Sequence, residues 1–312
     1  MVTVEADVVA GPLLAQEAEK AGVVYSLAWG DQPALVAEHV DWARTCGFEV
    51  VAAGKGTRMR SLLPKVLHRV CGRELVRLVV DSVKGGGFDK TVVVVAPDSN
   101  AIRKTLGDSV GYAVQSERRG TGHALLQARG LLEAVDTVAV LHGDVPLIRP
   151  DTLASMMRLH LASDACITLL TADRPSPDGM GRVVRDGSGR ISAIVEESEA
   201  DERILSLTEF NGGIYCFRAP WLWPHLEALV PSPRGEVFLT DLVAEASRQG
   251  LAIESVPVQT PEEILGVNTR VQLAQAEATL RQSLRERWML PAEQIVVKGY
   301  WKRGEAEYHA PH

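Results

Sequence analysis

The sequence predicts an α/β protein built on a mostly parallel sheet with helices on both faces. From residue 48 onward, short apolar segments rich in valine alternate with amphipathic segments of helical period. This alternation is typical of βαβ units, whose crossovers are right-handed and whose strands run parallel. After Asp173 the segments become shorter, and the Gly-containing turn at 186–189 predicts a hairpin. A smaller antiparallel part is therefore expected in the second half.

The expected elements follow one another in order along the chain. In the first half we expect strands at 48–53, 91–96, 112–115, 137–141 and 165–171, and helices at 74–84, 101–106, 121–132 and 149–161. In the second half we expect strands at 182–184, 191–196, 213–217 and 252–257, and helices at 221–229, 237–248 and 271–287. Residues 1–47 are expected to form helices at 12–21 and 34–44 around a strand at 23–28, which is less than a domain.

Composition and charge are those of a soluble globular protein. The chain has 312 residues, of which 46% are hydrophobic and 23% are charged, enough for one large domain or two. The formal net charge of −7 argues against a general nucleic-acid or membrane-surface binder. No apolar run approaches the roughly 18 residues of a membrane span, and the first residues lack a signal-peptide pattern. Four cysteines without a CxxC pair favour reduced thiols in a cytoplasmic protein.

A glycine-rich basic stretch follows the strand expected at 48–53. Residues 54–65 contain two glycines and four cations, so backbone N–H groups can approach an anion and its charge can be neutralised. The stretch is not a P-loop, because Glu49 stands where that motif needs glycine and Gly56 where it needs Ser or Thr. Nor is it a dinucleotide fingerprint, since Met59 occupies the third glycine position. We expect a phosphate-bearing ligand; an ordinary glycine-rich turn is the alternative.

Three loops are expected to meet at one edge of the sheet. They follow successive predicted strands and comprise residues 54–65, 115–122 and 142–147. In open parallel sheets the ligand lies outside the carboxyl ends of the strands, where such loops gather. The sequence therefore places a candidate binding site at that edge.

Seven further segments extend this pattern: Gln115–His123, Leu141–Leu147, Gly179–Arg182, Ile194–Glu197, Glu209–Gly213, Gly235–Asp241 and Gly266–Asn268. In order and spacing they resemble the uridylyltransferase domain of the bifunctional N-acetylglucosamine-1-phosphate uridyltransferases. These are sugar-nucleotide pyrophosphorylases of the nucleotide-diphospho-sugar transferase superfamily. The resemblance covers about residues 50–290. It implies a Rossmann-like fold of that superfamily, with a small antiparallel insertion that binds the sugar.

The resemblance implies a role for particular residues. The nucleotide would be bound by Ala52, Ala53, Gly54, Gly56, Gln115, Gly120 and Thr121. The catalytic residues would be Arg58, Lys65 and Asp144, and the sugar phosphate would be bound by Gly181, Glu196 and Asn211. Asp144 and Asn268 would bind Mg²⁺, which takes a few hard oxygen ligands from proteins and fills its remaining positions with water and phosphates.

The implied reaction is uridylyl transfer from UTP to an amino-sugar 1-phosphate. The phosphate of N-acetylglucosamine 1-phosphate would attack the α-phosphorus of UTP, release pyrophosphate and give UDP-N-acetylglucosamine. This phosphate is already ionised at pH 7, so catalysis needs positioning and charge neutralisation rather than a general base. His123 and His142 are accordingly expected to be structural. Neither a nucleic acid nor a membrane is expected as a partner, and the oligomeric state is open.

Three residues depart from the pattern of the family. Met180 and His142 stand where tyrosine is usual, and Gly212 stands where threonine usually follows the sugar-binding asparagine. These departures leave the nucleotide half intact and bear on the choice of sugar. A nucleotidyltransferase for another sugar 1-phosphate is one alternative, and a non-catalytic nucleotide-binding chimera is another. An NAD-dependent oxidoreductase ranks third.

The two ends of the chain differ from the family. Residues 1–57 resemble part of a homoserine-dehydrogenase-like oxidoreductase family, and this resemblance overlaps the other at 48–57, which predicts a fusion. That portion lacks a glycine fingerprint and so predicts no dinucleotide site. We expect an N-terminal extension (1–47), a nucleotidyltransferase domain (48–270) and a C-terminal helix and tail (271–312). No β-helix acetyltransferase domain, and hence no acetyl transfer, is expected.

Overall fold

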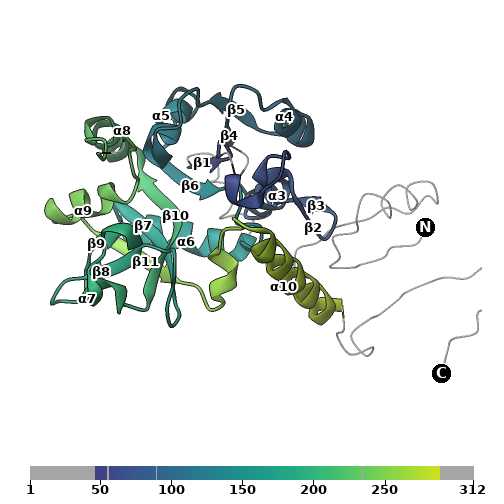
Figure 1. The fold of residues 1–312 in the computed structure, drawn as a ribbon. Helices are drawn as coiled ribbons and strands as arrows, with labels where there is room; N and C mark the ends of the chain where they lie inside the picture. Colours follow the sequence, from purple (N-terminus) through teal and green to yellow (C-terminus); the bar gives the residue numbers. More distant parts are fainter. Residues whose placement is uncertain (1–45, 55, 89, 234, 289–312) are drawn as a thin grey trace, which may run out of the picture. The chain divides into compact units, whose positions relative to one another are not determined.

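The valine-rich segments form the parallel half of a nine-stranded sheet in the computed structural model, which describes residues 46–54, 56–88, 90–233 and 235–288. Their order across the sheet is β6-β1-β4-β5, and every neighbouring pair is parallel (Figure 1). The strands are β1 (Cys46–Val51), β4 (Thr91–Val95), β5 (Gly111–Val114) and β6 (Thr137–His142). Parallel pairing brings the carboxyl ends of all four to one edge, as the sequence predicts.

The other half of the sheet is mixed. A ten-residue strand, β10, runs antiparallel between β6 and β7, and β11 pairs with β7 in parallel. The hairpin of β8 and β9 joins the sheet through β8, which pairs with β10. The bounds are β7 (Ile167–Asp173), β8 (Arg182–Arg185), β9 (Ile191–Val195), β10 (Glu209–Arg218) and β11 (Ile253–Pro257).

Helices cover both faces of the sheet, which confirms the predicted fold class. Alternate residues of β4 enter different cores: Val93 packs in one and Val94 in the other. The first core includes residues of α3 (Leu75–Gly85), α4 (Asn100–Leu106) and α6 (Pro150–Ala162). The second includes residues of α5 (Gly120–Leu132), α8 (Ala219–Ala228) and α9 (Asp241–Arg248). This alternation is the two-residue period of strands buried on both sides.

Smaller elements complete the described part of the chain. The 3₁₀ turns are η1 (Thr57–Met59), η2 (Lys65–Leu67), η3 (Gly107–Ser109), η4 (Glu197–Glu199) and η5 (Pro261–Ile264). A two-stranded hairpin, not expected from the sequence, consists of β2 (Arg69–Val70) and β3 (Arg73–Glu74), and the short helix α7 spans Glu202–Leu205. The last described helix is α10 (Arg270–Trp288). No helix among the described residues is long and apolar enough to cross a membrane.

Two predicted boundaries were wrong, for local reasons. The strand expected at 213–217 begins at Glu209, and the shift of register between Asn211 and Tyr215 marks a bulge that breaks the alternation. The helix expected at 237–248 begins only at Asp241, because the backbone of Val237 is hydrogen-bonded to Arg119 and Gly122. The elements expected within residues 12–44, and residues 289–312, lie outside the described residues.

Candidate active site

The carboxyl end of β6 carries Asp144 into the edge where the loops meet. The intervening Gly143 donates its backbone N–H to the carbonyl of Val51 at 2.9 Å, which ties this loop to the end of β1. A side chain at Gly143 would come within 3.2 Å of that same carbonyl oxygen, so the close approach favours glycine. Asp144 is therefore fixed by the two central strands of the sheet.

A second segment, residues 266–268, lies directly against Asp144. The N–H of Val267 donates to the backbone carbonyl of Asp144 at 2.8 Å. A Cβ added at Gly266 would be 3.3 Å from Asp144 Oδ2 and 3.4 Å from Asn268 Nδ2. Glycine at 266 thus lets the side chains of Asp144 and Asn268 approach one another, although they are far apart in the sequence.

Lys65 joins these two side chains. Its ammonium forms an ion pair with Asp144 Oδ2 and donates to Asn268 Oδ1 at 2.9 Å, with about a sixth or less of either charged side chain exposed. Arg58 Nη2 donates to the same Asn268 oxygen at 2.9 Å. Gly56 makes room for the lysine: its φ is 61°, and a Cβ there would lie 2.5 Å from Lys65 Cβ. Four of the predicted catalytic and metal-binding residues therefore meet at one point.

The donor set at this point fits a magnesium ion. Asp144 Oδ2 and Asn268 Oδ1 already face one cation, the Lys65 ammonium, which stands in for a positively charged guest. Both are hard oxygens, and Mg²⁺ in phosphate-handling sites is held by one or two such groups together with substrate phosphates and water. The residues present are therefore chemically suited to the predicted metal.

The predicted base-binding residues line the ends of β1 and β5. Ala52 and Ala53 are buried after β1, whereas Gly54 is exposed. Gln115 is also buried; its backbone N–H donates to Val95, and its side-chain amide donates to the Gly120 carbonyl at 3.1 Å. Ala52 N likewise donates to the Val94 carbonyl at 2.9 Å, so both loops are attached to β4, the strand between β1 and β5.

Gly120 and Thr121 open α5 against a strand-like segment that precedes α9. Gly120 has a φ of 90°, and a Cβ there would lie 2.8 Å from Val237 N and closer still to its carbonyl oxygen. Thr121 Oγ1 accepts from Leu239 N at 3.3 Å, and Gly122 N donates to Val237 at 2.9 Å. The start of α5 is therefore attached to the segment at 237–239, which leads to Thr240 and its bond with Glu196.

The three predicted sugar-binding residues also lie together. Asn211 N donates to the Gly181 carbonyl at 2.9 Å, and a Cβ at Gly181 would lie 3.5 Å from Glu196 Oε2. They come from three elements: the start of β8, the end of β9 and β10. Burial raises the pKa of Glu196, as do the nearby carboxylates of Glu199 and Asp241, against a hydrogen bond from Thr240 that lowers it.

Comparison with known proteins identifies the family. The model of the MobA-like NTP transferase domain matches residues 49–248, which include the parallel strands and the loops at their carboxyl ends. The chain belongs to the MobA-like NTP transferase family. It is accordingly a nucleotidyltransferase by family and fold.

Curated relatives of this NTP transferase share its sequence closely. Over 242 residues it is 45% identical to the "Bifunctional protein GlmU" of Heliobacterium modesticaldum, a match that covers 77% of this chain and 53% of the relative. The protein of the same name from Pelotomaculum thermopropionicum is 43% identical over 239 residues, covering 76% of this chain and 52% of the relative. The chain thus spans about half the length of the curated relatives it matches.

A solved structure supports the fold of the NTP transferase. It is a Bacillus anthracis protein assigned as a glucose-1-phosphate thymidylyltransferase, in complex with sucrose, with a TM-score of 0.63. The match covers 76% of this chain and 95% of that one at 18% identity, a level at which the likeness shows the fold alone. The oxidoreductase resemblance of residues 1–57 stays a prediction.

Two histidines of the NTP transferase lie beside the site. His142 ends β6, and burial lowers its pKa, as does Lys65, while Asp144 opposes them. The ring of His142 lies 3.0 Å from the position of a Cβ at Gly213, so it packs against the bulge of β10. His123 Nδ1 lies 3.1 Å from Gln115 Nε2. Both positions suit the structural role expected for them.

Sequence reasoning missed three residues of this NTP transferase site. Arg118 Nε donates to the Ala53 carbonyl at 2.8 Å and so joins two of the edge loops. Arg270, at the start of α10, donates to the loop that carries Arg58, and Thr240 donates to Glu196. Arg270 has no signal in the sequence, because an isolated arginine outside a motif is indistinguishable from a surface cation. Arg118 lay within the named segment Gln115–His123 but received no role. Thr240 lay within a named segment but received no role.

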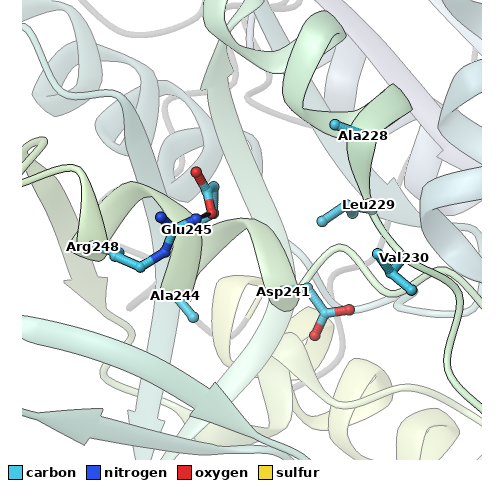
Figure 2. Close-up of a pocket in the computed structure, with 7 residues that line it drawn as sticks. All are labelled: Ala228, Leu229, Val230, Asp241, Ala244, Glu245 and Arg248. Atoms are coloured by element: carbon cyan, nitrogen blue, oxygen red, sulfur yellow. Dashed lines mark hydrogen bonds and ion pairs between the residues drawn. The ribbon is translucent and has the colours of Figure 1, made fainter.

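An open pocket of the NTP transferase lies between the end of α8 and α9 (Figure 2). Its lining residues are Ala228, Leu229, Val230, Asp241, Ala244, Glu245 and Arg248. Two of them, Glu245 and Arg248, form an ion pair along the exposed side of α9. The lining includes none of the predicted site residues.

Proposed function

We propose that this chain catalyses Mg²⁺-dependent uridylyl transfer from UTP to N-acetylglucosamine 1-phosphate, giving UDP-N-acetylglucosamine and pyrophosphate. The observation that carries the proposal is the meeting of Lys65, Asp144 and Asn268 beside Arg58. Two cations next to two hard oxygens form a site for a triphosphate and its metal, and the nucleotidyltransferase family provides the reaction type. The identity of the two substrates is inferred from the resemblance of the sequence motifs to the uridyltransferase family.

In this proposal the chain acts by positioning and neutralising charge. Arg58 and Lys65 bind the triphosphate, and Lys65 leaves Asp144 and Asn268 as it turns toward a phosphate oxygen. Mg²⁺ held by those two side chains would withdraw charge from the phosphoryl oxygens. Binding the two substrates in line then contributes to the rate, because a bimolecular reaction becomes an effectively unimolecular one between two bound groups. No side chain of the chain has to accept a proton.

Gly181, Glu196 and Asn211 are proposed to bind the sugar. Asn211 already donates from Nδ2 to the Tyr215 hydroxyl at 2.6 Å and accepts on Oδ1 from Gly213 N at 3.0 Å. An amide has two N–H donors and two acceptor lone pairs, so one of each stays available. The internal bonds fix the plane of the amide, and its remaining donor and acceptor can then bind sugar hydroxyls or the acetamido group.

A different sugar 1-phosphate is the second candidate, and Gly212 favours it. A Cβ at Gly212 would lie 2.7 Å from Ile264 Cδ1, so the threonine usual at this position in the family does not fit without moving Ile264. The packing of Ile264 beside residue 212 therefore requires glycine rather than threonine next to Asn211. A site altered here can select a different sugar while the nucleotide half stays the same.

The test is release of pyrophosphate from UTP and N-acetylglucosamine 1-phosphate in the presence of Mg²⁺. We expect activity in the wild type and its loss in Asp144→Ala. Asp108→Ala is the matched control, because Asp108 is exposed in η3, before β5, at the opposite edge of the sheet. Activity with another sugar 1-phosphate only would favour the second candidate. Absence of activity with every nucleotide and sugar phosphate, from protein that melts cooperatively, would overturn the proposal.

A further inference from the structure

We propose that Arg270 is a positioning residue, which holds the phosphate loop (residues 56–60) against the metal-binding turn (residues 266–268). The inference rests on the proposed function and deepens it. Arg270 Nε donates to the Met59 carbonyl and its Nη2 donates to the Arg60 carbonyl, each at 3.0 Å. One guanidinium therefore binds two consecutive carbonyls that lie more than 200 positions earlier in the chain.

The two carbonyls are ones that the loop cannot satisfy by itself. They belong to the last residue of η1 and to its C-cap, and the short 3₁₀ ladder of η1 consists of Met59 N to Gly56 and Arg60 N to Thr57. The last carbonyls of a helical turn have no partner within it and attract a cation. Arg60 itself has a φ of 47°, a left-handed conformation unusual for a residue with a side chain. A guanidinium, with its planar set of N–H donors, suits such a pair of acceptors.

Arg270 is itself fixed by the way α10 begins. Gln272 N donates to Thr269 Oγ1 at 3.2 Å, and Gln272 Oε1 accepts from Thr269 N at 3.0 Å and from Asn268 N at 2.8 Å. This is a capping box, and it includes the backbone of the predicted metal ligand. An arginine in the first turn of a helix is disfavoured by the helix dipole. Its contact with the loop accounts for its presence there.

Three side-chain hydrogen bonds consequently join the phosphate loop to Asn268 and Arg270. Besides the pair made by Arg270, Arg58 Nη2 donates to Asn268 Oδ1 at 2.9 Å. Arg58 lies in the same turn as Met59, so the bonds made by Arg270 fix the backbone from which Arg58 extends. The loop cation and the metal-binding oxygen are thus held in register before a triphosphate arrives, which lowers the cost of organising them on binding.

The test combines hydrogen exchange with kinetics on three variants of the full chain. Arg270→Ala removes both bonds. Arg270→Lys keeps the positive charge but loses the planar pair of N–H donors that binds the two carbonyls. Arg281→Ala is the matched control, since Arg281 lies on the same helix and binds Glu277 instead. Exchange at the Met59 and Arg60 amides is measured without substrates, and kcat and both KM values are measured with UTP and N-acetylglucosamine 1-phosphate.

We expect Arg270→Ala to speed exchange in the loop and to lower kcat by about 10-fold to 100-fold, the usual effect of a misplaced catalytic group. In Arg270→Ala the KM for the sugar phosphate and the melting temperature should stay unchanged. Arg270→Lys should recover part of the lost kcat, and Arg281→Ala should resemble the wild type. Unchanged loop exchange, or faster exchange throughout the protein with a lower melting temperature, would overturn the inference. An inactive wild type would remove the proposed function, and loop exchange would still decide whether Arg270 holds the loop.

Discussion

Lys65 Nζ donates to Asn268 Oδ1 at 2.9 Å, so a cation of the protein already occupies the oxygen predicted to bind magnesium. The same ammonium pairs with Asp144, the other predicted ligand. Metal and lysine are therefore expected to compete for these two side chains. A triphosphate resolves the competition, because its oxygens offer the ammonium a new partner and the metal additional ligands.

This competition predicts that Lys65→Met strengthens metal binding in the absence of nucleotide. Removing the ammonium frees Asp144 Oδ2, leaves Asn268 Oδ1 with its bond from Arg58, and removes a like charge. We expect about tenfold tighter binding of Mg²⁺ or Mn²⁺, or about 1.4 kcal/mol. Calorimetric titration with the metal alone measures it. Lys104→Met, on the exposed side of α4, is the control and should leave the affinity unchanged. Equal or weaker binding in Lys65→Met would show that Lys65 does not compete with the metal.

The backbone at Gly120 makes a second prediction. Gly120→Ala combines a positive φ with a collision against the backbone of Val237, and backbone cannot move aside as a flexible side chain does. We expect a loss of about 2–4 kcal/mol in the free energy of unfolding. Gly250→Ala has a similar φ of 71° but no atoms within 4 Å of the added carbon, and should cost about 1 kcal/mol. Denaturant titration of both variants compares them, and equal losses would contradict the collision.

A buried carboxyl on β1 makes stability depend on pH. Glu49 is fully buried, and neither of its oxygens has a hydrogen-bond partner among the described residues. Burial raises the pKa of Glu49 well above its ordinary value of 4.5. Above pH 4.5 the unfolded chain releases this proton while the folded protein retains it. Stability is therefore lost as the pH rises from 4.5 toward the folded pKa.

Glu49→Val should accordingly stabilise the protein, and more so at pH 8 than at pH 5. The gain is expected to be about 2 kcal/mol at neutral pH, the scale for a buried polar group without a partner. Glu254→Val is the control, because it makes the same substitution at a partly exposed strand residue. Denaturant titrations at pH 5 and pH 8 measure the difference. A gain that shrinks as the pH rises would mean that folding lowers the pKa of Glu49 rather than raising it.

The sequence predicts much of this fold because the strands carry a strong local signal. Runs such as 92–95 are buried on both faces and are apolar throughout, and the alternation of strands with helices implies parallel pairing. Parallel pairing then places Asp144 at the same edge as the glycine-rich loop. The strand β10 was predicted too short, because its bulge at Asn211–Gly213 interrupts the apolar pattern with polar and small residues.

The contacts within the site could be predicted only in part. That Lys65 and Asn268 belong to one site followed from the family resemblance, whereas their direct hydrogen bond depends on two loops packing together. The bonds made by Arg270 are equally long-range and leave no periodic trace in the sequence. The residues around Val237 predict a helix, yet its backbone is hydrogen-bonded to the start of α5. Tertiary contacts of this kind override local helix propensity.

On the sugar side, Tyr215→Phe should weaken binding of the sugar phosphate. The Tyr215 hydroxyl accepts from Asn211 Nδ2 at 2.6 Å and thereby fixes the orientation of this amide. Losing one such bond is worth about 1 kcal/mol, which corresponds to about a fivefold higher KM for the sugar 1-phosphate. The KM for UTP should not change. Tyr112→Phe, which removes a hydroxyl bonded to Gly107, is the control, and an equal rise in both variants would exclude a specific role for Tyr215.

On the nucleotide side, Arg118 bridges the loops that follow β1 and β5. Its bond to the Ala53 carbonyl at 2.8 Å crosses the end of β4, which lies between those strands in the sheet. Arg118→Ala should loosen the predicted base-binding loops and raise the KM for UTP by about fivefold, the value of one charge-assisted bond near the surface. The KM for the sugar phosphate should be unaffected, since Gly181 directly precedes β8 and Asn211 lies on β10, away from these loops. Arg119→Ala is the control, because it removes an equal charge from the same exposed loop. A similar KM for UTP in both variants would mean that binding of UTP requires the charge rather than the bond from Arg118 to Ala53.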